Sequence, residues 1–233
     1  MIKIIEYKIK FPLNAEFFKD PEILFLSKIY NEIYKCTCIN KQNLCNNCQK
    51  KQNCIYYFLS GENFSKYPAI GIKRSIINKR RYFSNDVLSL KFYLIGVAAN
   101  YSEFITAFMQ TEETIGKHFF QKVLVKNELL NTNTVFEGNV QFKNVVIDTE
   151  DIINSIHYYN EKYKCNFDIP IFEEIKYVMQ VKDETLYRIC NNYVRIKGKT
   201  FKVRVKKYSN LFFDIGLGKY GFIGGGQASC ELE

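Results

Sequence analysis

Apolar and polar residues alternate through the first stretch of the chain, and this alternation predicts a β-strand over residues 2–11. Pro21 stands where a helix can begin, and the apolar residues after it recur at helical spacing, which predicts a helix over residues 22–35. Residues 61–86 are rich in turn formers and basic groups. The pattern then predicts a strand at 87–95, a helix at 97–112 and a strand at 119–125.

The second half of the chain begins with a similar order of elements. The pattern predicts a strand near 140–147, a helix at 150–163, a strand at 173–181 and a hairpin near 192–207, before a glycine-rich loop and a last strand. Both halves follow the order of the ferredoxin-like split βαβ motif. We therefore expect an α+β protein with two tandem ferredoxin-like, RRM-like folds, one over residues 1–130 and one over residues 131–233.

Composition and charge narrow the class of protein. The 233 residues are 47% hydrophobic, but no apolar run is long enough to cross a membrane, and the N-terminus lacks the apolar core of a signal peptide. We expect a soluble, cytoplasmic protein without a membrane partner. The formal net charge of +9 favours a polyanionic partner, although surface lysines alone also produce such an excess.

Five of the eight cysteines fall within residues 36–54, and a clustered set of this kind favours metal ligation over disulfides. Cys45 and Cys48 form a C-x-x-C turn that lets two thiolates reach one ion. Cys54 and either Cys36 or Cys38 complete a set of four. We expect a structural zinc ion in this cysteine knuckle, with an iron–sulfur cluster as the alternative.

A glycine-rich loop over residues 216–226 lies close to the C-terminus. Its glycines repeat as G-x-G, five residues, G-x-G, and Lys219 adds a charge inside it; the four are Gly216, Gly218, Gly224 and Gly226. Glycines allow positive φ and let a backbone approach a phosphate closely, which makes the loop a candidate RNA contact. A glycine-rich turn before the last strand is the alternative. The spacing excludes both a dinucleotide-binding fingerprint and a Walker A loop.

A second RNA-binding candidate is a run of basic residues over 195–207. Lys202, Arg204 and Lys206 alternate with apolar residues, so a strand here has one cationic and one apolar face. The parity changes at 198–201, where a turn is expected, after three further basic residues, Arg195, Lys197 and Lys199. Such a ribbon suits a phosphate backbone, although a solvated strand face has the same pattern. Arg80 and Arg81 in a separate basic segment are further candidates.

The glycine-rich loop and the cysteine knuckle together resemble one known family. The loop resembles the signature loop of the RAMP superfamily, in particular the repeat-processing endoribonucleases of CRISPR systems (the sixth Cas family). A subset of that family has a cysteine knuckle after its first helix, then a Tyr/Phe run and a Pro-containing basic segment. Here the corresponding residues are Tyr56-Tyr57-Phe58 and Tyr67-Pro68. The resemblance extends over nearly the whole chain.

This resemblance implies two ferredoxin-like folds, binding of CRISPR repeat RNA or guide RNA, and a place in antiviral defence. Family members cut within the repeat without a catalytic metal: the ribose 2′-hydroxyl attacks the next phosphate. Many of them place a general-base histidine in or near the first helix. Residues 1–60 of this chain contain no histidine, so no catalytic residue is transferred by position.

We therefore select candidate catalytic residues by the chemistry of their side chains. The two histidines, His118 and His157, are candidate general bases because imidazole titrates near neutral pH, although each also suits a structural role. Lys28 and Tyr30 lie on the first predicted helix, where the resemblance places the site; Tyr30 shares an apolar face and Lys28 suits a solvated position.

Three functions fit these features. The first is an endoribonuclease that matures CRISPR RNA. The second is a non-catalytic RAMP subunit that holds guide RNA among other CRISPR effector subunits, which the missing N-terminal histidine favours. The third is a metal-stapled RNA-binding module unrelated to CRISPR.

Overall fold

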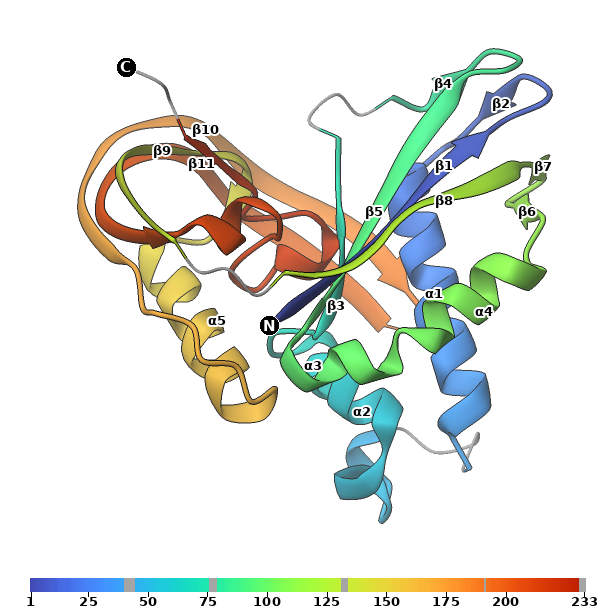
Figure 1. Ribbon diagram of the computed structural model, residues 1–233, viewed down its shortest axis with the longest axis horizontal. Coiled ribbons are helices and arrows are strands. Elements are labelled where there is room, and N and C mark those ends of the chain that lie inside the picture. The colour runs from blue at the N-terminus through green and yellow to red at the C-terminus, as the bar shows by residue number, and fades with distance from the viewer. Residues whose placement is uncertain (40–44, 76–78, 131–133, 191, 231–233) are drawn as a thin grey trace.

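The computed structural model describes residues 1–39, 45–75, 79–130, 134–190 and 192–230 (Figure 1). In the N-terminal half, four antiparallel strands form one sheet in the order β3-β5-β1-β8. These strands are β1 (Ile2–Lys10), β3 (Ile70–Lys73), β5 (Val87–Ile95) and β8 (Gln121–Leu130). Helix α1 (Pro21–Thr37) connects β1 to β3, and α4 (Glu103–Thr111) follows β5, which gives the ferredoxin-like topology.

Short elements connect and extend this half. The 3₁₀ helices η1 (Cys45–Asn47) and η2 (Lys51–Asn53) lead into α2 (Ile55–Leu59) and α3 (Gly61–Phe64), and η3 (Gly96–Tyr101) precedes α4. Two small two-stranded sheets lie at one end of the main sheet (Figure 1). They pair β2 (Ala15–Glu16) with β4 (Arg81–Tyr82), and β6 (Thr114–Ile115) with β7 (His118–Phe119).

The C-terminal half repeats the topology with one replacement. Its sheet has the order β10-β11-β9-β12 and is antiparallel throughout. The elements are β9 (Val135–Val146), α5 (Thr149–Lys162), β10 (Ile171–Ile189), β11 (Asn192–Ser209) and β12 (Ala228–Cys230). Where a ferredoxin-like fold has its second helix, this half has η4 (Asn210–Phe213), η5 (Gly221–Ile223) and the glycine-rich loop.

The α+β class and the tandem ferredoxin-like topology expected from the sequence are confirmed. The expected hairpin near 192–207 is wrong, because β11 runs unbroken through it and the reversal lies between β10 and β11. The parity change at residues 198–201 is a bulge: the register of β11 against β9 shifts between Lys199 and Phe201. Gly198 lies at this bulge because a Cβ there would stand 2.2 Å from the Val146 carbonyl oxygen.

A shared core joins the two halves. Tyr93 of β5 is fully buried and donates its hydroxyl to the Gly221 carbonyl of the glycine-rich loop. Tyr163, at the end of α5, donates to the Phe58 and Tyr67 carbonyls at 3.1 and 3.0 Å. The two halves therefore hold each other in a fixed orientation. No helix in these described ranges is long and apolar enough to span a membrane.

Candidate nucleic-acid interface

The glycine-rich loop is buried between the two halves. Residues 216–218 and 220–227 are buried, and only Lys219 is exposed. The glycines permit this close packing: a Cβ on Gly226 would stand 1.9 Å from the Leu217 carbonyl oxygen, and one on Gly218 would stand 2.4 Å from Asp151 Oδ2. The absence of side chains is therefore required for packing within the protein.

Most amides of the loop already have partners inside the protein. The Gly218 N–H donates to Ser155 Oγ at 3.1 Å and the Lys219 N–H donates to Asp151 Oδ2 at 2.9 Å, so two side chains of α5 bind the loop. The Gly224 and Gly226 N–H groups donate to carbonyl oxygens at 2.8 and 3.1 Å. In this conformation these four amides are not available to a phosphate, and the exposed part of the loop is the Lys219 side chain.

A charged cluster lies beside the loop, and we call Asp20, Arg74, Arg80 and Tyr187 the inter-half clasp. The Asp20 and Arg74 side chains are buried, whereas that of Arg80 is 46% exposed. Asp20 Oδ2 pairs with Arg74 Nη2 at 3.0 Å and accepts the Tyr187 hydroxyl at 3.1 Å, while Asp20 Oδ1 pairs with Arg80 Nε at 3.0 Å. The Arg74 guanidinium also lies over the Tyr187 ring, 5.6 Å from its centroid. A Cβ on Gly224 would stand 2.6 Å from the Arg74 side chain. The clasp thus connects α1, the segment after β3, β10 and the loop.

The basic ribbon lies on β11. Val203 and Val205 face the core, and the alternate residues Arg204 and Lys206 are exposed. Both cations pair with one carboxylate, Glu173 of β10, at 3.1 Å. The ribbon therefore has the predicted cationic face, but part of its charge is neutralised.

Four other basic candidates also lie on β11, and Arg80 belongs to the clasp. Arg195 and Lys197 are exposed, and Lys199 and Lys202 are half-buried. The Lys197 N–H donates to the Tyr220 hydroxyl at 3.3 Å, which fixes this part of β11 to the glycine-rich loop.

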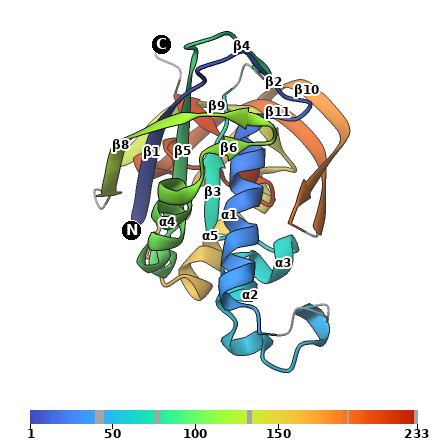
Figure 2. The same cartoon turned by 90° about the vertical axis from the view of Figure 1, so that its right-hand side faces the viewer.

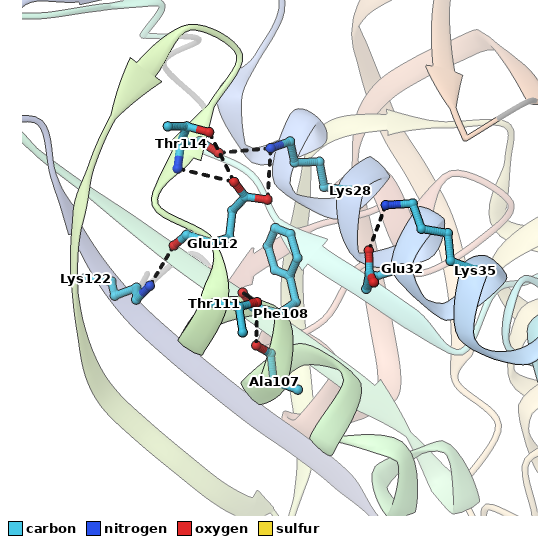
Figure 3. Close-up of polar contacts among 9 residues, drawn as sticks. All are labelled: Lys28, Glu32, Lys35, Ala107, Phe108, Thr111, Glu112, Thr114 and Lys122. Carbon is cyan, nitrogen blue, oxygen red and sulfur yellow. Dashed lines mark hydrogen bonds and ion pairs between the residues drawn. The ribbon is translucent and has the colours of Figure 1, made fainter.

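Lys28 and Tyr30 have structural contacts on α1. Lys28 Nζ lies 3.1 Å from Glu112 Oε2 and donates to the Thr114 carbonyl at 3.0 Å, which holds the β6–β7 hairpin against the helix (Figure 3). Burial alone would raise the Glu112 pKa, but Lys28 and the Thr114 N–H and hydroxyl lower it below its usual value. Tyr30 is fully buried and donates to the Leu59 and Ile70 carbonyls at 3.2 and 2.7 Å, so its hydroxyl does not face solvent.

The two histidines lie on different parts of the molecule. His118 is half-buried at the β6–β7 hairpin, with its ring 4.9 Å from the Phe17 ring and its Nε2 2.9 Å from the Glu16 carbonyl oxygen. Because a carbonyl only accepts, Nε2 carries the hydrogen, and Nδ1 is the atom able to take a proton. His157 is exposed on α5, two residues from the buried Ser155 that binds the glycine-rich loop. The structure does not place the two histidines in one site.

The cysteine knuckle is described in part, and residues 40–44 lie outside the described residues. Cys36 is exposed, whereas Cys38, Cys45, Cys48 and Cys54 are half-buried. Burial, and then the charges of Cys38 and Cys54, raise the Cys45 pKa, so these thiols lie within electrostatic reach of each other. Within the described ranges, no three His, Cys, Asp or Glu side chains form a group that could hold a metal ion.

Sequence reasoning missed the clasp as a unit. Asp20 and Tyr187 are 167 positions apart, and neither belongs to a motif. The one available signal was Asp20 directly before Pro21, a helix-capping position. In the structure Asp20 is the N-cap residue, but its carboxylate makes no capping hydrogen bond because it binds the clasp cations instead.

These features define a class of fold: two ferredoxin-like halves packed around a buried glycine-rich loop. Solved structures with this fold include two described as Cas6 product complexes. One is 9% identical with a TM-score of 0.52, covering 96% of this chain and 98% of that one. The other is 8% identical with a TM-score of 0.51, covering 100% of both chains. A RAMP protein described as binding different RNA substrates is 14% identical with a TM-score of 0.51, covering 98% and 99%.

At such identities the similarity shows the fold. No protein-family model matches the sequence. No curated protein matches it either.

Proposed function

We propose that this chain binds CRISPR repeat RNA and cleaves it within the repeat by metal-independent attack of a ribose 2′-hydroxyl. The observation that carries the proposal is the full-length RAMP fold combined with a cationic face on β11, which carries Arg204 and Lys206. Two similar structures are described as Cas6 product complexes, and one as a RAMP protein that binds RNA.

The chemistry requires few protein groups, because the nucleophile belongs to the RNA. The protein holds the 2′-hydroxyl in line with the scissile phosphate, accepts its proton and stabilises the charge on the phosphate. His118 is the favoured base, because its hydrogen bond to the Glu16 carbonyl fixes the ring and leaves Nδ1 able to accept a proton. Lys219 is the exposed cation of the glycine-rich loop and suits contact with the RNA backbone.

A non-catalytic RAMP subunit is the second candidate function. The observation that favours it is the separation of the candidate groups: His118 lies on the β6–β7 hairpin, whereas α5, which carries His157, binds the loop through Asp151 and Ser155. Such a subunit would bind guide RNA and other CRISPR effector subunits. Both functions place the protein in the cytoplasm and in antiviral defence.

A structural zinc ion in the cysteine knuckle also belongs to the proposal. The donor types fit, because half-buried Cys38, Cys45, Cys48 and Cys54 offer four thiols, the usual ligand type of a structural zinc site, and an ion would have to draw them together. A bound ion would order a polar segment that has little core of its own. An iron–sulfur cluster is the alternative, since it takes the same four ligands.

The deciding experiment incubates the purified chain with its cognate repeat RNA in EDTA. Cleavage with a cyclic phosphate on one product supports the endoribonuclease. Tight binding without cleavage supports the non-catalytic subunit. Equal affinity for the repeat and for unrelated RNA hairpins would contradict both CRISPR functions.

A further inference from the structure

The short strands β2, β4 and β6 lie at one end of the N-terminal sheet (Figures 1 and 2). Two hollows lie side by side there, lined by residues of β2, β4 and β7 and the segments next to them. Their volumes are about 460 and 470 Å³, within the range of small-ligand sites. Glu16, Lys117 and His118 line both hollows, so these residues form the wall between them. The two hollows therefore form one continuous surface, which we call the tip.

Aromatic rings project from the tip into solvent. Phe18 lines one hollow and is 95% exposed, and Phe83 lines the other and is 71% exposed. Phe119 of β7, next to the shared wall, is 62% exposed. Burying a phenylalanine is favourable by a few kcal/mol, so several exposed rings in one place indicate an interaction surface.

The backbone that carries these rings is held in place. The Phe83 N–H donates to Asp86 Oδ2 at 3.0 Å, and the next residue, Ser84, donates its N–H to Asn14 Oδ1 at 2.8 Å. Directly before Phe18, the Phe17 N–H donates to the Arg80 carbonyl at 2.8 Å. Ordered backbone presents these rings, so a ligand that stacks on them meets a preorganised surface.

The charge at the tip is positive. Glu16 forms an ion pair with Arg81 at 2.8 Å, and both side chains are largely exposed. Lys19 and Lys117 also line the hollows, so the lining carries three cations against one carboxylate. Aromatic rings with surrounding lysine and arginine are the combination that binds single-stranded nucleic acid, because bases stack on the rings and phosphates meet the cations.

We propose that the tip is a binding site for unpaired nucleotides of RNA, with one base stacked on Phe18, another on Phe83, and the connecting phosphates beside Lys117 and Arg81. The proposal deepens the proposed function and rests on it. It assigns single-stranded segments of the RNA to the tip, apart from the basic ribbon of β11. A purely apolar protein partner is disfavoured because three cations line the hollows.

The chain has no tryptophan, so a single introduced one reports on its own surroundings. The test uses full-length Phe18→Trp and Phe83→Trp variants, titrated with a 12-nucleotide oligouridine and, separately, with a fully paired RNA duplex. Oligouridine is expected to quench both reporters, because an unpaired base stacks on the indole. The duplex is expected to quench them far less, because its bases are already stacked.

Leu129→Trp is the matched control. Leu129 lies on β8, 50% exposed, and pairs with Lys3, whereas the tip end of β8 is Gln121, which pairs with Lys10. Its fluorescence is expected to stay unchanged. A Phe18→Ala, Phe83→Ala double variant is expected to bind oligouridine at least roughly 30-fold more weakly, since it removes two stacking contacts. Both positions are exposed, so the fold is retained, which circular dichroism checks.

The outcomes separate this proposal from the proposed function. If the wild type binds the repeat RNA but both tip reporters stay silent, or Leu129→Trp responds equally, the tip proposal fails. His118, which lines both hollows, then loses its role as the base, and RNA binding by the rest of the molecule stands. Reporters that respond to protein concentration and not to oligouridine also overturn it and assign the tip to self-association. If the wild type binds no RNA at all, both fail.

Discussion

Arg74 Nη2 lies 3.0 Å from Asp20 Oδ2, and the two side chains are only 8% and 2% exposed. A charge that is buried this deeply is tolerated because it is paired, and removing one partner leaves the other buried without its counter-charge. Asp20 accepts from Arg74, Arg80 and Tyr187 together, so it is the centre of the clasp.

We expect Asp20→Ala to lower the free energy of unfolding by about 3–5 kcal/mol, the usual cost of breaking a buried ion pair. Urea denaturation measures the change. Glu16→Ala is the matched control, because it breaks the exposed pair with Arg81 and should cost about 1 kcal/mol or less. Equal losses in the two variants would show that the clasp contributes no more than a surface ion pair.

Because the glycine-rich loop is packed between the two halves, substitution of its glycines should lower the stability of the protein. Gly226 has φ +59°, and a Cβ there would stand 1.9 Å from the Leu217 carbonyl oxygen, so Gly226→Ala adds a clash to the backbone strain. Gly116 has φ +63° with no atom within 4 Å of an added Cβ, so Gly116→Ala isolates the strain, about 1–2 kcal/mol. Thermal unfolding should show a clearly larger loss for Gly226→Ala.

RNA affinity distinguishes a glycine-rich loop that only packs between the two halves from one that binds the phosphates of RNA. Because the Gly226 amide donates to the Val145 carbonyl, folded Gly226→Ala protein should keep most of its RNA affinity, measured below its unfolding transition. A large loss of affinity with unchanged stability would assign the loop to RNA contact instead.

Glu173 of β10 neutralises part of the positive charge of the basic ribbon on β11. Glu173 pairs with Arg204 and Lys206, so Glu173→Gln frees two cations and should tighten RNA binding. Glu161→Gln on α5 removes the same charge from an exposed pair with Lys162 and is the control. Reversal of Arg204 and Lys206 to Glu should weaken binding and flatten the dependence of log Kd on log salt, because fewer counterions are released. If Glu173→Gln and Glu161→Gln act alike, the RNA lies elsewhere.

Metal content tests the cysteine knuckle. Because Cys38 is half-buried and Cys36 is exposed, we expect Cys38→Ser to lose the ion and Cys36→Ser to keep about one ion per chain. Elemental analysis of anaerobically purified protein measures this, and visible absorbance would identify an iron–sulfur cluster. Metal-free wild-type protein would contradict the site.

The sequence predicted the elements that local periodicity determines. The bounds of β1, α1 and β5 lie within two residues of those predicted. Each of these elements buries an apolar face in the core, and this produces a clear periodic pattern. The bulge at Gly198 was mistaken for a turn, since a bulge and a turn both reverse the parity of apolar residues. The role of the glycine-rich loop was not predictable from its spacing, because its amide partners, Asp151 and Ser155, lie more than sixty positions away. Local patterns do not contain such distant contacts.

If the chain cleaves RNA, we expect His118 to act as the general base. The ring is oriented by the Glu16 carbonyl and by Phe17, so Nδ1 has a fixed direction. Losing a general base typically lowers the rate by roughly a hundred- to ten-thousand-fold. We expect His118→Ala to show this loss in EDTA with RNA affinity largely kept, and His118→Gln, which keeps a donor for Glu16, to be equally slow.

His157→Ala should cut at the wild-type rate. His157 is exposed on α5, and the described contacts include no group that orients its ring. Single-turnover cleavage in EDTA measures these rates, and a slow His118→Gln with normal RNA affinity would identify the imidazole as the base. If His118→Ala and His157→Ala both cut normally, the proton goes to a tyrosine or lysine instead. If the wild type binds its repeat tightly and leaves it intact, the protein is the non-catalytic subunit.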